Sequence, residues 1–113
     1  IAPGITLHRM PGHTMGMQAV RVRTKRGWVL LASDASHYYE HWFKRVPFAI
    51  CWLPDELMSS YERFEQLADS QDHVIPGHDP LVRSLYPQVS SDLARNVVRL
   101  DVSPIKLLKD VFC

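Results

Sequence analysis

The chain has 113 residues, of which 46% are hydrophobic and 22% are charged, so it can build one small core and no more. Its net charge is +1 with histidine neutral, which excludes the strong field that recruits nucleic acid or an anionic membrane. No apolar run approaches the roughly 20 residues of a membrane span. We therefore expect an ordinary globular domain that binds neither nucleic acid nor membrane.

The two cysteines, Cys51 and Cys113, are too few and too irregularly spaced for a disulfide framework. A reducing, cytoplasmic location is therefore the expectation. The sequence opens on Ile1-Ala-Pro-Gly4 without an initiator methionine, and no basic start or apolar stretch marks a signal peptide. This opening favours a chain that begins inside a longer protein.

The first third of the chain predicts three strands. Residues 5–8 predict a short strand, residues 18–24 alternate, and residues 28–32 are a continuous apolar run typical of a buried strand. A turn at residues 25–27 ends on a glycine, which tolerates a positive φ. We expect it to join the second and third strands as a hairpin.

Helices dominate the rest of the prediction. Residues 37–44 predict a short helix, and residues 55–68 a longer one with an acidic first turn and an apolar face at spacings of three and four. Residues 73–76 predict a short strand, and residues 91–100 a further helix that begins on Ser-Ser-Asp. This order of elements indicates a mixed α/β layered domain.

The densest basic cluster lies around the predicted hairpin and consists of Arg21, Arg23, Lys25 and Arg26. No phosphate-binding glycine motif accompanies it. We interpret this cluster as a solvated face of the hairpin rather than a phosphate-binding patch.

Three polar residues follow apolar, strand-like segments: His13 in Pro-Gly-His-Thr-Met-Gly, Asp34 in Leu-Leu-Ala-Ser-Asp, and His78 in Pro-Gly-His-Asp. Glycine permits backbone angles closed to other residues and proline stiffens the approach, so such loops can aim an imidazole at a fixed point. Neutral imidazole and carboxylate are common ligands of zinc and its neighbours. Taken alone, each motif is typical of a turn or a helix cap. All three lie at the end of a strand-like segment, however, and this common placement indicates a metal site.

The order and spacing of these motifs over about residues 1–87 resemble the second half of the metallo-β-lactamase superfamily, and most closely its acyl-homoserine-lactone lactonases. The resemblance implies an α/β fold that is half of an αββα sandwich, a mixed sheet with helices on one face. Residues 1–113 would then be the C-terminal half of such a domain.

The resemblance also implies roles for individual residues. His13 would bind the first metal, His78 the second, and Asp34 would bridge two divalent metal ions, usually zinc. A hydroxide shared by the metals would attack a small lactone, which would make the complete protein a quorum-quenching hydrolase. Many of these lactonases place a substrate-binding tyrosine three residues after the bridging aspartate, where this chain has His37 followed by Tyr38, so these two are further catalytic candidates.

The family motif His-x-His-x-Asp-His, which supplies four further ligands from the N-terminal half, is absent from the sequence. Because catalytic zinc usually has three protein ligands, we expect the isolated chain to bind metal weakly. A missing N-terminal half or a second copy in a homodimer would complete the site.

Other functions stay open. One is a non-catalytic half-domain that acts as a binding or dimerisation module through its exposed inner sheet face. Another is an esterase or thioesterase of the same fold. A third comes from His37-Tyr-Tyr-Glu40-His41, which matches the inverted zinc-protease pattern, although so short a pattern often arises by chance.

The remaining candidates have two interpretations each. Five aromatic residues could form core or line an acyl-chain site: Trp42, Phe43, Phe48, Trp52 and Tyr61. Asp79 could orient the imidazole of His78 or be a surface acid. His8 and His73 are expected to be structural or surface residues.

Overall fold

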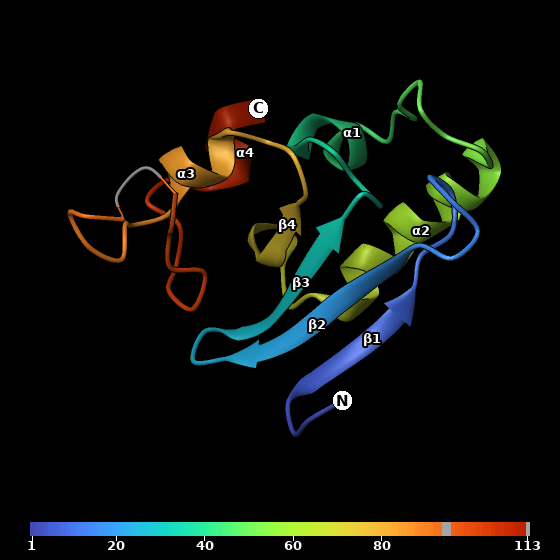
Figure 1. The fold of residues 1–113 in the computed structure, drawn as a ribbon. Coiled ribbons are helices and arrows are strands. Elements are labelled where there is room, and N and C mark those ends of the chain that lie inside the picture. Colours follow the sequence, from blue (N-terminus) through green and yellow to red (C-terminus); the bar gives the residue numbers. More distant parts are fainter. Residues whose placement is uncertain (94–95, 113) are drawn as a thin grey trace.

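The structure is a computed structural model that describes residues 1–93 and 96–112. Figure 1 shows a small sheet with its helices above and behind it. The elements are β1 (Ile5–Arg9), β2 (Gln18–Thr24), β3 (Gly27–Ser33), α1 (Tyr39–Phe43), α2 (Pro54–Leu67), a 3₁₀ turn η1 (Gln71–His73), β4 (Val74–Pro76), α3 (Leu81–Leu85) and α4 (Leu108–Phe112). Within these ranges, no helix is both long enough and apolar enough to cross a membrane.

The four strands form one mixed sheet in the order β1-β2-β3-β4. β2 pairs antiparallel with both β1 and β3, and β4 pairs parallel with β3. β1, β3 and β4 therefore run in the same direction, and their carboxyl ends meet at one edge of the sheet. The predicted hairpin between β2 and β3 is confirmed, and its turn glycine, Gly27, has a φ of 117°.

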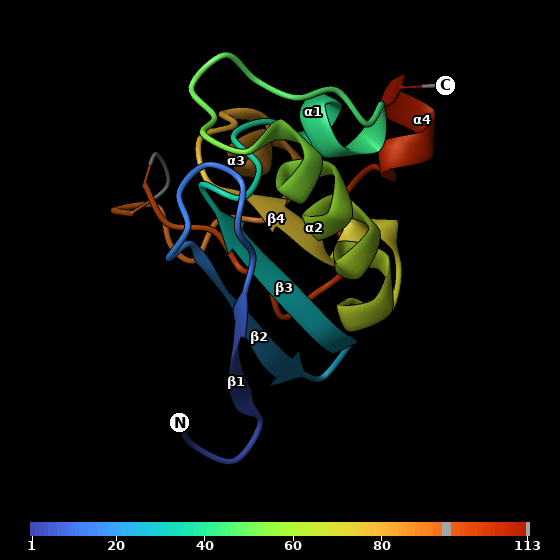
Figure 2. The same cartoon turned by 90° about the vertical axis from the view of Figure 1, so that its right-hand side faces the viewer.

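The long helix α2 covers one face of the sheet, as Figure 2 shows. Pro54 at its first position and two acids in the first turn favour helix initiation at this point. Its apolar face buries Leu57, Tyr61 and Phe64 completely, which confirms the face predicted from their spacing. These side chains belong to the same core cluster as the buried sheet residues Ala19, Leu30 and Ala32.

The other face of the sheet carries an apolar row that is only partly covered. Leu7, Val20 and Leu31 are direct cross-strand partners in this row. Leu7 is 46% exposed, and Val20 and Leu31 are of intermediate exposure. The sheet is thus packed fully on one side, as predicted for half of a two-sheet sandwich.

The helix predicted over residues 91–100 is wrong. Residues 91–93 form a turn, residues 96–100 are not helical, and residues 94–95 lie outside the described part. The backbone instead pairs with an earlier segment: Val98 bridges Gln88, and the Arg99 amide donates to the Pro87 carbonyl at 2.8 Å. The Ser-Ser-Asp signal that suggested a helix start serves a turn equally well.

Two short helices, α3 and α4, were not predicted, because each has only five residues and lacks a recognisable periodic face. The helix predicted over residues 37–44 is shorter in the structure and begins at Tyr39. His73, predicted to open a strand, belongs to η1, and the strand follows it.

The basic cluster was predicted to be a solvated face of the hairpin, but two of its members, Arg26 and Arg21, instead bind other parts of the domain. Arg26 donates to the carbonyls of Leu100 at 2.8 Å and Asp72 at 3.1 Å and to the Tyr86 hydroxyl at 2.9 Å. These contacts join residues that are far apart in the sequence, so no local pattern predicts them. Arg21 similarly donates to a carbonyl at the end of α2 and lies 3.9 Å from the centre of the indole ring of Trp28. Both arginines therefore connect the hairpin to the rest of the domain.

Candidate metal centre

The candidate site lies at the sheet edge where β1, β3 and β4 end. His13 lies in the loop that follows β1, Asp34 comes directly after β3, and His78 comes two residues after β4. Because these three strands run in one direction, their following loops emerge at the same edge. The topology therefore brings together residues that are 21 and 44 positions apart in the chain.

The loop that carries His13 is held by close backbone packing at Gly12. Its φ of 147° is unfavourable for residues with a side chain, and a Cβ there would lie 2.6 Å from Cα of Leu57. The Gly12 carbonyl accepts hydrogen bonds from the amides of Trp52 and Leu53, both at 3.0 Å. Glycine is thus required for conformation and for space, which goes beyond the flexibility argument made from the sequence.

Two side-chain hydrogen bonds also fix the loop that carries His13. The buried Ser60 hydroxyl, from α2, donates to the Pro11 carbonyl at 2.8 Å. Nδ1 of His13 lies 2.7 Å from the Ile50 carbonyl, and a carbonyl can only accept, so Nδ1 carries the proton. Nε2 of neutral His13 is then free to act as a ligand.

The loop that carries His78 is held by a different neighbour. A Cβ on Gly77 would lie 2.6 Å from the Ser33 carbonyl oxygen, so only glycine fits against the end of β3. The Gly77 amide donates to the Ser36 carbonyl at 3.0 Å, and the His78 amide donates to the His37 carbonyl at 2.9 Å. The segment after β3 and the segment after β4 are thereby joined.

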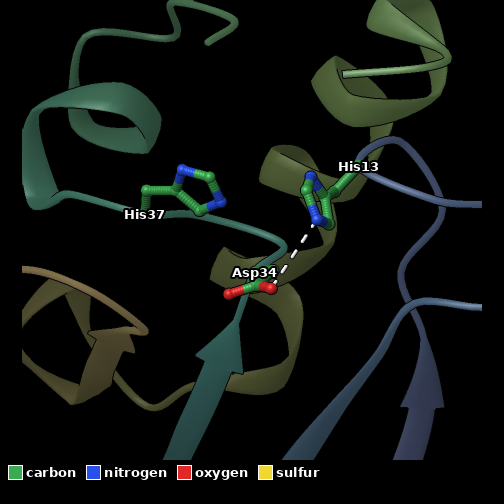
Figure 3. A group of neighbouring side chains, drawn as sticks. All are labelled: His13, Asp34 and His37. Atoms are coloured by element: carbon green, nitrogen blue, oxygen red, sulfur yellow. Dashed lines mark ion pairs between the residues drawn. The ribbon is translucent and has the colours of Figure 1, made fainter. Parts of the chain in front are cut away.

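Asp34 lies between the two Pro-Gly-His loops. Its Oδ1 lies 2.7 Å from Nε2 of His78, and its Oδ2 lies 3.6 Å from Nε2 of His13. The side chain of His13 is 19% exposed, that of Asp34 37% and that of His78 57%. Each carboxylate oxygen therefore faces a different imidazole at a solvent-accessible edge, and Figure 3 shows the contact with His13.

His37 joins this group from the loop between β3 and α1. One ligand atom each from His13, Asp34 and His37 lie within 4.8 Å of one another, and these residues could hold a metal ion. The His37 ring stacks on Phe48 with a centroid distance of 4.0 Å. Burial lowers the pKa of His37, which favours the neutral form that can bind a metal.

Tyr38, the other catalytic candidate, is 43% exposed and contacts the ring of His41 at a centroid distance of 5.2 Å. The structure thus brings His13, Asp34, His37 and His78 together, and Tyr38 lies next to this group on the chain. The roles assigned to these five residues stay predictions.

The zinc-protease pattern does not form a site. Helix α1 begins at Tyr39, so His37 precedes the helix and does not share a helical face with His41. Glu40, which would be the base, is exposed and pairs with Lys44. The pattern needs a continuous helix through both histidines, and the chain has none there.

The other polar candidates have structural roles. Asp79 accepts from the Tyr39 amide at 3.0 Å and from the Leu81 amide at 2.9 Å. It therefore fixes the starts of two helical segments rather than orienting His78. His73 lies 2.9 Å from the Arg26 carbonyl through Nε2, which confirms the structural interpretation of that residue.

A shallow apolar hollow adjoins the His13 loop, with a volume of about 330 Å³ and a lining of Thr14, Met15 and Trp52. Of the aromatic cluster, Trp42 and Tyr61 are buried in the core, whereas Trp52 is 81% exposed. The sequence distinguishes Trp52 as one of five aromatic candidates but not Met15, since nothing in the local pattern separates Met15 from a core methionine.

Similar proteins were found among both characterised sequences and solved structures, although no family model matches the chain. The N-acyl homoserine lactonase of Bacillus thuringiensis is 36% identical over 81 residues, which are 70% of this chain and 32% of that protein. A "probable metallo-hydrolase" of Mycobacterium tuberculosis is 38% identical over 86 residues, which are 71% of this chain and 26% of that protein.

One solved structure is an N-acyl homoserine lactone hydrolase with the product N-hexanoyl-L-homoserine bound at its catalytic metal centre. It matches with a TM-score of 0.65 and 32% identity, over 74% of this chain and 34% of that one. The mixed sheet with its helices is therefore the fold of these lactonases over most of the chain. The chain spans about a third of the length of the curated lactonase that it matches.

Proposed function

Since this chain is a partial match to the lactonase-like proteins of the metallo-β-lactamase superfamily, we propose that it supplies His13, Asp34 and His78 to a metal site that opens a small lactone ring. The observation that carries the proposal is the position of Asp34. Its two carboxylate oxygens face two different imidazoles, at 2.7 Å and 3.6 Å. A carboxylate arranged in this way can hold two cations side by side.

The donor set fits divalent ions of the zinc type, which favour imidazole nitrogen and carboxylate oxygen. His13 is already oriented for this role, because its Nδ1 proton is given to the Ile50 carbonyl. Two ions would each receive one imidazole from this chain and share Asp34. Further ligands would then have to come from outside residues 1–113, and we propose a segment of the His-x-His-x-Asp-His type. On this basis the chain is the C-terminal half of the complete domain.

When bound, such ions polarise a carbonyl oxygen and lower the pKa of water towards neutrality. The residues of this chain would hold the ions and contact the substrate. His13 and His78 approach from separate loops whose backbones are held by Gly12 and Gly77. Either His37 or the neighbouring Tyr38 would contact the lactone.

The substrate class follows from the relatives and from the apolar hollow. The solved structure at 32% identity holds a product with a hexanoyl chain. In this chain, Met15 and Trp52 expose apolar surface next to the His13 loop. We therefore propose a lactone with an apolar substituent as the substrate, an acyl-homoserine lactone or a relative of it.

A second candidate function is a non-catalytic half-domain that binds another sheet. It is favoured by the row of Leu7, Val20 and Leu31, of which Leu7 is 46% exposed. A missing half-domain or a second copy of the chain would cover this row. Size-exclusion chromatography separates the possibilities, and a stable monomer would argue against this function.

The decisive variant for the metal site is Asp34→Asn, which keeps the shape of the side chain and removes its charge. Protein dialysed against Zn²⁺ is analysed for bound metal by mass spectrometry, with Asp92→Asn, at an exposed acid, as the control. Asp34→Asn should lose most of its bound metal, whereas the control should keep it. Equal metal content in both variants would contradict the proposed site.

Lactone opening is measured in a pH-stat with N-hexanoyl homoserine lactone, because the ring opens to an acid that releases a proton. Hydrolysis that depends on Zn²⁺ and is lost in Asp34→Asn would support the lactonase function. Because the proposed two-metal site needs ligands from outside residues 1–113, the assay uses the chain together with the segment that completes the site, and the chain alone is expected to be inactive. A completed protein that binds metal but does not hydrolyse the lactone would contradict the lactonase function and favour the half-domain function.

A further inference from the structure

We propose that His37 is a metal ligand, and that His13, Asp34 and His37 together hold one divalent transition-metal ion without any ligand from outside this chain. The inference rests on the proposed metal site through His13 and Asp34. It adds a third ligand and a one-metal state that the proposed two-metal function does not contain.

The His37 ring is held in place by packing, while its nitrogens make no hydrogen bond within the described part of the chain. The ring stacks on Phe48 at 4.0 Å with an interplanar angle of 23°, so its plane is set by packing. Within the described ranges, no hydrogen bond engages the His37 ring, whereas His13, His73 and His78 each use at least one nitrogen. Neither nitrogen of the His37 ring is among the buried polar atoms without a partner, so an ion from solvent can reach them.

The three side chains also lie close enough together to bind one ion. The candidate ligand atoms of His13, Asp34 and His37 all lie within 4.8 Å of one another. Zinc binds nitrogen and oxygen at about 2.0–2.2 Å, so tetrahedral ligand atoms lie roughly 3.3–3.6 Å apart. Small rotations of the side chains close this difference. Figure 3 shows His13 and His37 on opposite sides of the space above Asp34.

The number and kind of these ligands also fit a catalytic zinc site. Two imidazoles and one carboxylate, with a fourth position left open, form a set that catalytic zinc sites use. All three residues are of intermediate exposure, so an ion can reach them from solvent. The proposed two-metal site gives each metal one histidine of this chain and a shared aspartate. In the one-metal state the first metal instead has two histidines and the aspartate.

His78 acts in this arrangement as a positioning residue. Its Nε2 lies 2.7 Å from Oδ1 of Asp34, which leaves Oδ2 directed towards His13. Its amide also donates to the His37 carbonyl at 2.9 Å. One residue thus fixes both the carboxylate and the backbone that carries the third ligand.

The test compares two histidines that both pack against Phe48. His37→Phe keeps an aromatic ring but removes the two nitrogens. His41→Phe is the matched control, because the His41 ring lies 5.1 Å from Phe48 but is not in the ligand group. Circular dichroism and urea unfolding confirm that each variant folds, and His37→Gln replaces His37→Phe if the latter does not.

The full chain is titrated with Co²⁺, followed by its visible absorption, and with Zn²⁺ by calorimetry. The parent chain should bind one ion, and His37→Phe should weaken its Kd about 10-fold to 100-fold or more, since changes around the ligands alone cost this much. His41→Phe should bind as the parent does. His78→Gln should bind more weakly than the parent but more tightly than His37→Phe.

Three results would overturn the proposal. One is an unchanged Kd in His37→Phe. Another is an equal loss in His41→Phe. The third is a thiolate charge-transfer band of Co²⁺, which would assign the ion to a cysteine. If His78→Gln loses the ion and His37→Phe does not, the ligands are those of the proposed function and only this inference fails. If Asp34→Asn also leaves binding unchanged, both proposals fail.

Discussion

The two Pro-Gly-His segments have the same three residues, but they are held in different ways. In the first, Pro11 and Gly12 are buried, and His13 is 19% exposed in its side chain. In the second, Pro76 is buried but Gly77 is exposed, and the side chain of His78 is 57% exposed. The first segment lies against α2 and the loop before it, whereas the second lies against the chain that follows β3.

This difference shows that the same local sequence can be fixed by unrelated tertiary contacts. Gly12 has a positive φ and a close neighbour, whereas Gly77 has only the close neighbour. The first loop therefore depends on two physical constraints and the second on one. We expect substitutions in the first loop to destabilise the protein more, and those in the second to act more selectively on the site.

The largest effect is expected for Gly12→Ala. The new Cβ would meet Cα of Leu57 at 2.6 Å, and a φ of 147° is strained for alanine. Backbone strain and overpacking together should cost about 2–6 kcal/mol. Urea unfolding measures this change, and a loss below that of Gly77→Ala would contradict the comparison of the two loops.

Gly77→Ala should have an intermediate effect. Its Cβ would meet the Ser33 carbonyl oxygen at 2.6 Å, but no positive φ adds strain, so the cost should be about 1–3 kcal/mol. The clash should push His78 away from Asp34. The Nε2 chemical shift of His78, measured by NMR, should therefore change more than that of His13. Equal changes at both histidines would contradict independent anchoring.

Ser60→Ala should have the smallest effect of the three. Ser60 is buried, and its hydroxyl bonds to the Pro11 carbonyl at 2.8 Å. Leaving this carbonyl unpaired should cost about 1 kcal/mol, the lower end of the usual penalty for an unpaired buried group. The matched control is Ser59→Ala, whose exposed hydroxyl bonds only to the Asp55 carbonyl within the same helix. Its cost should lie within about 0.5 kcal/mol, and an equal loss in both variants would exclude a special role for the Ser60 contact.

Much of the fold could be predicted from the sequence, because the signals are local. The hairpin depends on alternation, an apolar run and a turn glycine, and α2 depends on Pro54, its acidic first turn and the spacing of Leu57, Tyr61 and Phe64. The prediction failed at residues 91–100, where Val98 pairs with Gln88. A helix-cap signal cannot report a distant partner, so the same residues were assigned to the wrong structure.

The sequence by itself named His13, Asp34, His37, Tyr38 and His78 as candidates, because their motifs follow strand-like segments and glycine and proline shape two of the loops. Only the tertiary structure decided how they are arranged. The parallel course of β1, β3 and β4 brings the loops to one edge. The stacking of His37 on Phe48 and the hydrogen bond from His13 to Ile50 then fix the imidazoles. These contacts join residues 11 and 37 positions apart, and local propensity carries no information about such separations.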